Sequence, residues 1–167
     1  MKRTLLTITF VTTFASAVFG QGMKMPMGSA DIAVTNAWAR ATLGTATTGA
    51  VYVTITDNGP PDRLTGFSTP VAGMAQLHEM KTVNGVMRMR EVASIPLQTG
   101  KPVTLAPGGY HVMLTRLKRP LREGDTLPLT LTFEHAAPIT VQVKVAASGA
   151  TMPMSNMPGM HMPGTKQ

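Results

Sequence analysis

No cysteine occurs among the 167 residues of the chain. A disulfide scaffold, a zinc-thiolate site, an iron-sulfur cluster, a thiol nucleophile and a blue-copper centre each need a cysteine sulfur, so all of them are excluded. Carboxylates are also few, at eight Asp plus Glu, and the chain has no paired-carboxylate motif, no G-x-S-x-G, no H-E-x-x-H and no phosphate-binding loop. With so little catalytic apparatus, we predict that the protein is not an enzyme.

Aromatic residues are scarce as well, with five Phe, two Tyr and one Trp, whereas methionine occurs 14 times. Basic residues outnumber acidic ones by 15 to eight, but they are scattered and no aromatic stacking platform accompanies them. Nucleic acid is therefore not expected as a partner. The excess of methionine over aromatic residues therefore needs a chemical explanation.

A secretory signal explains the start of the chain. Two basic residues precede an uncharged run over residues 5–19, and small side chains offer cleavage after Ala17 or Gly20. We predict a signal peptide over residues 1–20 and a secreted protein without stable membrane insertion after cleavage. Because the run is short and rich in Thr for a membrane span, an uncleaved anchor is the alternative.

The rest of the chain divides into three segments by composition. Residues 21–30 form a short Met-containing segment and residues 148–167 form a low-complexity, Met/His-rich tail. Both lack the aromatic and β-branched content that offsets the entropy cost of ordering, so we expect the first to be flexible and the second to be disordered. Residues 31–147 form the predicted folded domain, which we expect to be a monomer.

In the folded segment, apolar and polar residues alternate with the period of two that is typical of half-buried strands. Turn signals such as Asn-Gly and Pro-Gly-Gly separate these stretches, and no long helical period competes. The predicted strands lie near residues 31–38, 50–57, 63–68, 75–83, 86–93, 101–106, 109–117, 126–133 and 138–146. We predict an all-β, antiparallel Greek-key sandwich, cupredoxin-like or immunoglobulin-like, with one solvated face on each strand and disordered termini.

One hairpin can be predicted in register. Asn84-Gly85 is the strongest short-range signal for a two-residue type I′ turn, which sets each residue opposite a known partner on the other strand. One face of this hairpin then carries His78, Met80, Met87, Met89 and Glu91. The other face, which we expect to be exposed to solvent, carries Glu79, Lys81, Arg88 and Arg90. His78 and Met89 are diagonal neighbours, with Cα atoms about 7 to 8 Å apart.

A second His-x-Met unit lies in the predicted strand 109–117. There His111 and Met113 point away from the face that Val112 and Leu114 turn to the core. Thioether sulfur is soft and neutral and imidazole is intermediate, so a mixed set of the two favours Cu(I) over hard ions. The candidate copper ligands are therefore His78, Met89, His111 and Met113.

Packing is the alternative explanation for any single methionine, because methionine is an ordinary core filler. We expect Met74 to lie in the core, and Met80 and Met87 to pack or to support the site. His135, in a turn-like Glu-His-Ala-Ala sequence, is expected to be a solvated loop residue.

The spacing of the four candidate ligands, H-x10-M-x21-H-x-M, resembles the signature of the PCuAC family of periplasmic copper chaperones. The similarity covers residues 31–146 and includes AWARA at 37–41, GAVY at 49–52, LHEM at 77–80, VMRMR at 86–90, PGGYH at 107–111 and PLTL at 128–131. Some members have Met after the first His, where this chain has Glu79, on the other face of the hairpin.

The resemblance implies a cupredoxin-like sandwich that binds one Cu(I) through two His and two Met near its surface. It also implies delivery of copper towards the copper A centre of cytochrome c oxidase, directly to an oxidase subunit or through a thiol-bearing copper chaperone. Two other functions stay open: a periplasmic copper resistance or storage protein with the same ligands, and a metal-free β-sandwich binding module.

The tail has a composition of its own, with five methionines and one histidine in eleven residues. These are Met152, Met154, Met157, Met160, His161 and Met162. The tail resembles the Met/His-rich extensions of some chaperones in the same family, and we predict that it captures additional copper. An uninvolved soluble tail is the alternative.

Overall fold

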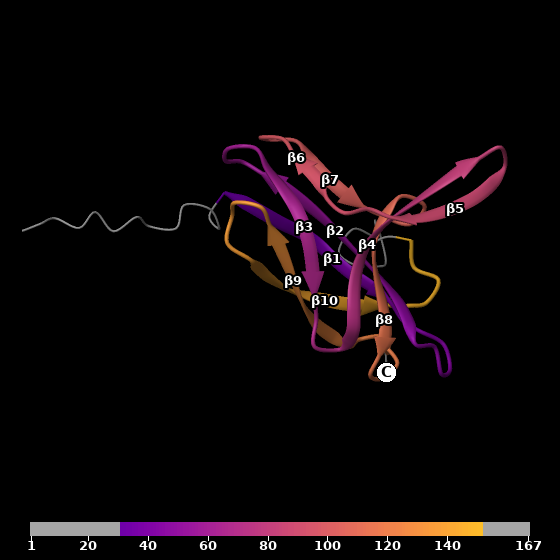
Figure 1. The fold of residues 1–167 in the computed structure, drawn as a ribbon. Helices are drawn as coiled ribbons and strands as arrows, with labels where there is room; N and C mark the ends of the chain where they lie inside the picture. The colour runs from indigo at the N-terminus through magenta and orange to yellow at the C-terminus, as the bar shows by residue number, and fades with distance from the viewer. Residues whose placement is uncertain (1–30, 152–167) are drawn as a thin grey trace, which may run out of the picture.

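Residues 31–151 are described by the structure, a computed structural model, and form ten strands (Figure 1). The predicted signal peptide, the segment 21–30 and the methionines of the tail lie outside the described residues. Within residues 31–151, no helix has the length and apolarity needed to cross a membrane.

The strands are β1 (Ile32–Arg40), β2 (Thr48–Asp57), β3 (Asp62–Ser68), β4 (Ala72–Val83), β5 (Val86–Glu91), β6 (Ile95–Leu97), β7 (Pro102–Leu105), β8 (Tyr110–Leu117), β9 (Thr126–Phe133) and β10 (Ile139–Ala146). Nine of them coincide with the predicted strands to within a few residues at each end. The exception is β6, which the alternation did not predict because it has only three residues with Pro96 at its centre. It pairs with β3 at the edge of the described sheet.

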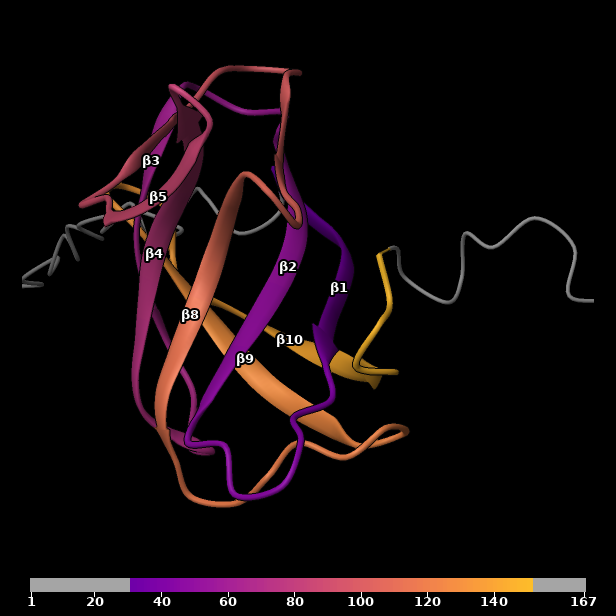
Figure 2. The ribbon, with the colours of Figure 1, turned by 90° about the vertical axis from the view of Figure 1, so that its right-hand side faces the viewer.

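All ten strands belong to one hydrogen-bonded sheet with the order β5-β4-β8-β2-β1-β10-β9-β3-β6, and β7 also pairs with β2. This sheet folds over into two layers. In Figure 2, β4, β8 and β2 form the near layer, and β9 and β10 cross behind them. Every pairing is antiparallel except that of β1 with β10, which joins the two layers. The all-β prediction is therefore confirmed.

The core between the layers is built from the alternating apolar residues of the strands. Leu129 and Leu131 of β9 and Val51 of β2 are fully buried. Val143 of β10 is also fully buried and belongs to the same core cluster. Each such side chain contributes about 1.5 to 3 kcal/mol by leaving water. In these strands, the alternation of apolar and polar residues thus matches the alternation of buried and exposed side chains.

One strand departs from the prediction of a solvated outer face. Tyr52 of β2 is only 4% exposed, because β1 sets Trp38 directly beside it with ring centroids 4.5 Å apart. Ala146 and Ala150 pack on the same pair. Burial raises the pKa of Tyr52, and the nearby Arg40 guanidinium partly offsets this. A small second apolar cluster therefore covers part of the outer face.

The predicted hairpin is present as β4 and β5, and its register is confirmed at six residue pairs, from His78 opposite Glu91 to Val83 opposite Val86. Asn84 and Gly85 have φ angles of 52° and 77°, the left-handed values that a type I′ turn requires at both central positions. The hairpin tip projects from the sandwich (Figure 1). Its position brings the candidate ligands of β5 beside those of β4 and β8.

Candidate metal centre

Strand β8 lies on the other side of β4 from β5, and this pairing places His78 directly opposite His111. The two imidazole ring centroids are 6.0 Å apart. Leu77, which precedes His78, and Val112, which follows His111, also form a pair and are buried in the core. The histidines therefore lie on the face of the sheet that points away from the core.

The two candidate methionines flank this histidine pair on the same face. Met89 lies opposite Met80, two residues along β4 from His78. Met113 lies opposite Gln76, two residues from His78 in the other direction. Because directly opposed residues, and residues two apart in a strand, share a face, the structure brings all four predicted ligands to one face of three adjacent strands.

Burial varies across these four residues. His111 is 5% exposed, His78 and Met113 are partly buried, and Met89 is 49% exposed. The imidazoles thus lie deeper than the thioether of Met89, which sits on the edge strand.

The hydrogen bonding of the two histidines is compatible with metal binding. Nδ1 of His111 lies 3.2 Å from the carbonyl oxygen of Gly109, and the tautomer with a proton on Nδ1 donates to that oxygen and leaves a lone pair on Nε2. Both ring nitrogens of His78 are buried and have no hydrogen-bond partner among the described residues. A buried polar atom left unpaired costs about 1 to 3 kcal/mol, and a bound ion would remove that cost. The residues therefore fit a soft metal ion.

Glu79 corrects the prediction that the charged face of the hairpin is solvated. It is 4% exposed, and its carboxylate accepts hydrogen bonds from Lys81 Nζ at 2.7 Å, from Arg90 Nη2 at 2.6 Å and from Arg90 Nε at 2.8 Å. Hydrogen bonds from Lys81 and then Arg90 lower the pKa of Glu79 to about 2. Glu79 continues the core-facing side of β4 beyond Leu77, and the long basic side chains cover it.

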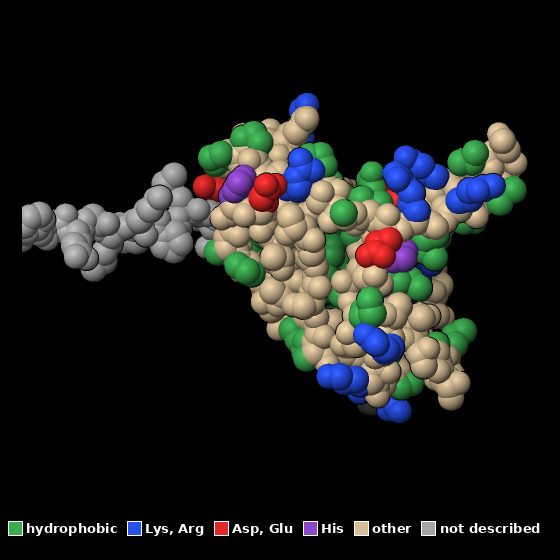
Figure 3. Space-filling model, viewed as in Figure 1, with side chains coloured by type: hydrophobic (Ala, Val, Ile, Leu, Met, Phe, Trp, Pro, Cys, Tyr) green, Lys and Arg blue, Asp and Glu red, His purple; other side chains and the backbone are tan. Residues whose placement is uncertain are grey.

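The predictions for the other methionines of this region are partly wrong. Met74, expected in the core, is 41% exposed, because its position in β4 places it on the same outer face as His78. Met87 is 68% exposed and so does not pack, whereas Met80 is partly buried. Figure 3 shows hydrophobic side chains at the projecting end of the hairpin and Lys and Arg side chains along it.

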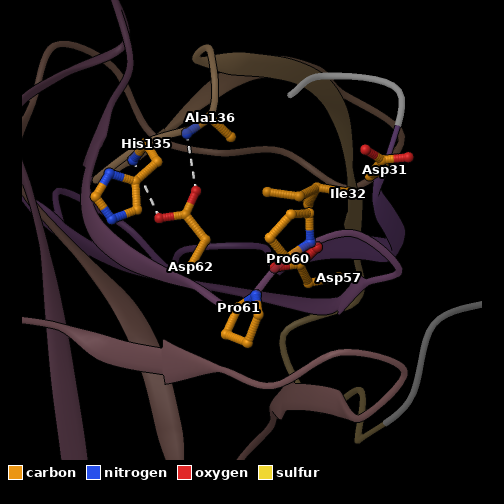
Figure 4. A pocket seen from close by; sticks show the side chains of 8 residues that line it. All are labelled: Asp31, Ile32, Asp57, Pro60, Pro61, Asp62, His135 and Ala136. Carbon is orange, nitrogen blue, oxygen red and sulfur yellow. Dashed lines mark hydrogen bonds between the residues drawn. The ribbon is translucent and has the colours of Figure 1, made fainter. Parts of the chain in front are cut away.

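His135 lies apart from these residues, in an exposed position as predicted. It borders a pocket of about 200 Å³ together with carboxylates that include Asp57 and Asp62 (Figure 4). Burial raises the pKa of Asp62, but backbone N–H donors of Arg63, Ala136 and His135 outweigh it and lower the pKa. Within residues 31–151, no group of three or more His, Asp or Glu could hold a metal ion.

A second hollow, of about 410 Å³, lies beside Met113. Tyr52, Arg40 and Ser148 also line it, and Arg40 Nε donates a 2.8 Å hydrogen bond to the carbonyl oxygen of Ala150. The first residues of the tail, 148–151, thus lie on the Met113 side of the sheet. Residues 152–167, with all the methionines of the tail and His161, lie outside the described part.

The sequence and the fold were compared with those of known proteins. The family profile "Putative lipoprotein LpqE-like" matches residues 32–145. A relative from Leifsonia xyli subsp. xyli, "Putative lipoprotein Lxx21020", is 35% identical over 116 residues, which are 68% of this chain and 69% of the relative.

Solved structures agree with this assignment. The PCuAC domain of PmoF2 superimposes with TM-scores of 0.61 in its apo form, at 29% identity over 73% of this chain and 94% of the domain, and 0.59 in its copper-bound form, at 28% identity over 70% and 93%. The Cu(I) form of DR1885 from Deinococcus radiodurans has a TM-score of 0.51 at 32% identity, over 66% of this chain and 75% of that one. The predicted cupredoxin-like sandwich is thereby confirmed, and the chain belongs to the LpqE-like lipoprotein family, which shares the fold of the PCuAC copper-binding domains.

Proposed function

We propose that this protein is a periplasmic copper chaperone that binds one Cu(I) through His78, Met89, His111 and Met113. The observation that carries the proposal is the placement of these four side chains on one face of β5, β4 and β8, with the two imidazoles opposed across β4 and β8. Residues up to 35 positions apart in the sequence thus come to one face of the sheet.

The chemistry of this ligand set suits reversible copper carriage. Thioether and neutral imidazole are soft to intermediate donors without charge, so they favour Cu(I) over hard divalent ions. A thiolate acceptor binds Cu(I) more strongly than neutral donors do, and transfer to such an acceptor is therefore favourable. Methionine also suits an oxidising compartment, where cysteine thiols are drawn into disulfides.

The relatives support the proposal. One of the similar PCuAC domains is known in a copper-bound form, and DR1885 is known with Cu(I). Membership of a lipoprotein family supports export from the cytoplasm, in agreement with the predicted signal peptide. These relatives are described as metal-binding domains and lipoproteins, which agrees with a role other than catalysis.

As the destination of the copper we propose the copper A centre of cytochrome c oxidase, reached through an oxidase subunit or a thiol-bearing chaperone. Oxidase activity in a deletion strain tests this, measured with and without added copper. Loss of activity that external copper restores supports delivery, whereas normal activity combined with copper sensitivity supports resistance or storage.

Anaerobic Cu(I) titration tests the ligand set. The double variant His78→Ala, Met113→Ala should lose tight binding of Cu(I) while keeping the fold. The matched control is His135→Ala, Met74→Ala, which removes one exposed imidazole and one exposed thioether outside the ligand set. Equal affinity in the two double variants would refute these ligands.

A further inference from the structure

Glu79 is one of two buried carboxylates among the described residues, and the ligand set leaves it unused. Its partners are the side chains of Lys81 on its own strand and Arg90 on β5, which are 62% and 69% exposed. The Glu79 carboxylate is thus buried, whereas the side chains of Lys81 and Arg90 that bind it are largely exposed to solvent.

The register gives this cluster a particular relation to the proposed copper ligands. Arg90, Glu79 and Tyr110 lie opposite one another across β5, β4 and β8. Their immediate sequence neighbours are three of the four proposed ligands: Met89, His78 and His111. Successive residues in a strand point to opposite faces, so the cluster lies beneath the ligands on the other side of the same three strands.

Strand β5 needs such an anchor. It is the edge strand of the described sheet, it pairs with β4 alone, and every one of its six residues is exposed. A two-stranded ribbon without a core beneath it is marginally stable in water. The side chain of Arg90 bound to Glu79 adds a side-chain link between β5 and β4 to the backbone pairing, directly beside Met89.

We infer that Glu79 is a positioning residue for the metal centre, which holds the Met89 strand at the histidine pair by binding Arg90 and Lys81. The inference rests on the proposed function. Glu79 does not touch the ion, because it lies on the opposite face of β4 from His78. Its removal should thus weaken one ligand selectively and leave Met113 of β8 in place.

The test is Cu(I) loading of the full chain labelled with ¹³C at the methionine ε-methyl groups. In the unmodified protein, both the Met89 and the Met113 methyl signals should move on addition of Cu(I). In Glu79→Gln, the Met113 signal should move as before, the Met89 shift should be reduced, and the Cu(I) affinity should fall by about tenfold or more, as for other residues that orient metal ligands. The matched control is Glu134→Gln, which removes an exposed carboxylate paired with Arg63 far from the hairpin.

The outcomes separate the two hypotheses. If the unmodified protein binds no Cu(I) tightly, the proposed function fails. If it binds but Glu79→Gln keeps the full affinity and the full Met89 shift, or loses both methyl shifts equally, the inference about Glu79 is overturned. Should Glu79→Gln fail to fold, Arg90→Gln breaks the same link from an exposed edge position and is read out in the same way.

Discussion

His78 and His111 lie directly opposite each other on adjacent antiparallel strands, with ring centroids 6.0 Å apart, and the buried nitrogens of His78 have no hydrogen-bond partner within residues 31–151. Buried polar atoms without hydrogen-bond partners lower the free energy of unfolding by about 1 to 3 kcal/mol each. Coordination of Cu(I) by these nitrogens, as proposed, would remove that cost.

This cost can be measured with His78→Leu. The apolar side chain removes two buried unpaired nitrogens, so we expect the apo-protein to gain about 1 kcal/mol in free energy of unfolding. Tight Cu(I) binding should be lost at the same time. Urea unfolding of the apo-protein and Cu(I) titration give the two values. A less stable apo-protein would show that the buried nitrogens are paired in solution.

The hairpin turn is expected to control both stability and binding. Gly85 has a φ of +77°, a conformation that costs a residue with a side chain about 1 to 2 kcal/mol, so Gly85→Ala should lower the free energy of unfolding by about that amount. Because the turn sets the register of Met89, the Cu(I) affinity should also fall. Gly66→Ala is the control, since an added Cβ there meets nothing closer than 3.9 Å. It should change stability by less than about 1 kcal/mol.

Acid should destabilise the protein in part through Asp125. The side chain of Arg119 and the backbone N–H of Arg122 hydrogen-bond this carboxylate and lower its pKa from the ordinary value of 3.8. Because the pKa is lower in the folded state, the ionised carboxylate stabilises the folded protein at pH values above the ordinary pKa. This stabilisation is lost as the pH falls towards the lowered pKa. Asp125→Asn should therefore flatten the fall in the free energy of unfolding between about pH 5 and about pH 2. Urea unfolding over this range is the measurement, and an unchanged slope would contradict the role of the pair.

The core between the layers should dominate stability. Leu129 is fully buried, so Leu129→Ala should cost about 2 to 5 kcal/mol. Leu43 is 75% exposed, and Leu43→Ala should stay within about 0.5 kcal/mol of the unmodified protein. Chemical denaturation of the two variants compares them directly, and equal losses would argue against the buried position of Leu129.

Deleting residues 152–167 tests the tail. If its methionines and His161 capture additional copper, the truncated protein should bind fewer equivalents of Cu(I) while the affinity of the main site stays the same. Metal analysis after anaerobic loading of the full and truncated chains provides the count. Unchanged stoichiometry would leave the tail without a role in copper binding.

The sequence predicted what depends on near neighbours. Alternation identified nine strands, and Asn84-Gly85 predicted the hairpin register at every pair, because a two-residue turn constrains the residues on both sides of it. It missed β6, where three residues with a central proline show no usable alternation. It also placed Glu79 in solvent and Met74 in the core. Alternation separates two faces of a strand, but it does not tell which parts of a face other elements will cover.

By itself, the sequence determined the all-β class, the two faces of each strand and the presence of two His-x-Met units, since these follow from local periodicity and composition. Only the tertiary structure decided that β8 pairs with β4 and that β1 runs parallel to β10. Those pairings join strands far apart in the chain, and their free energy comes from burying whole faces against one another. That long-range packing sets His111 opposite His78 and Glu79 beneath them.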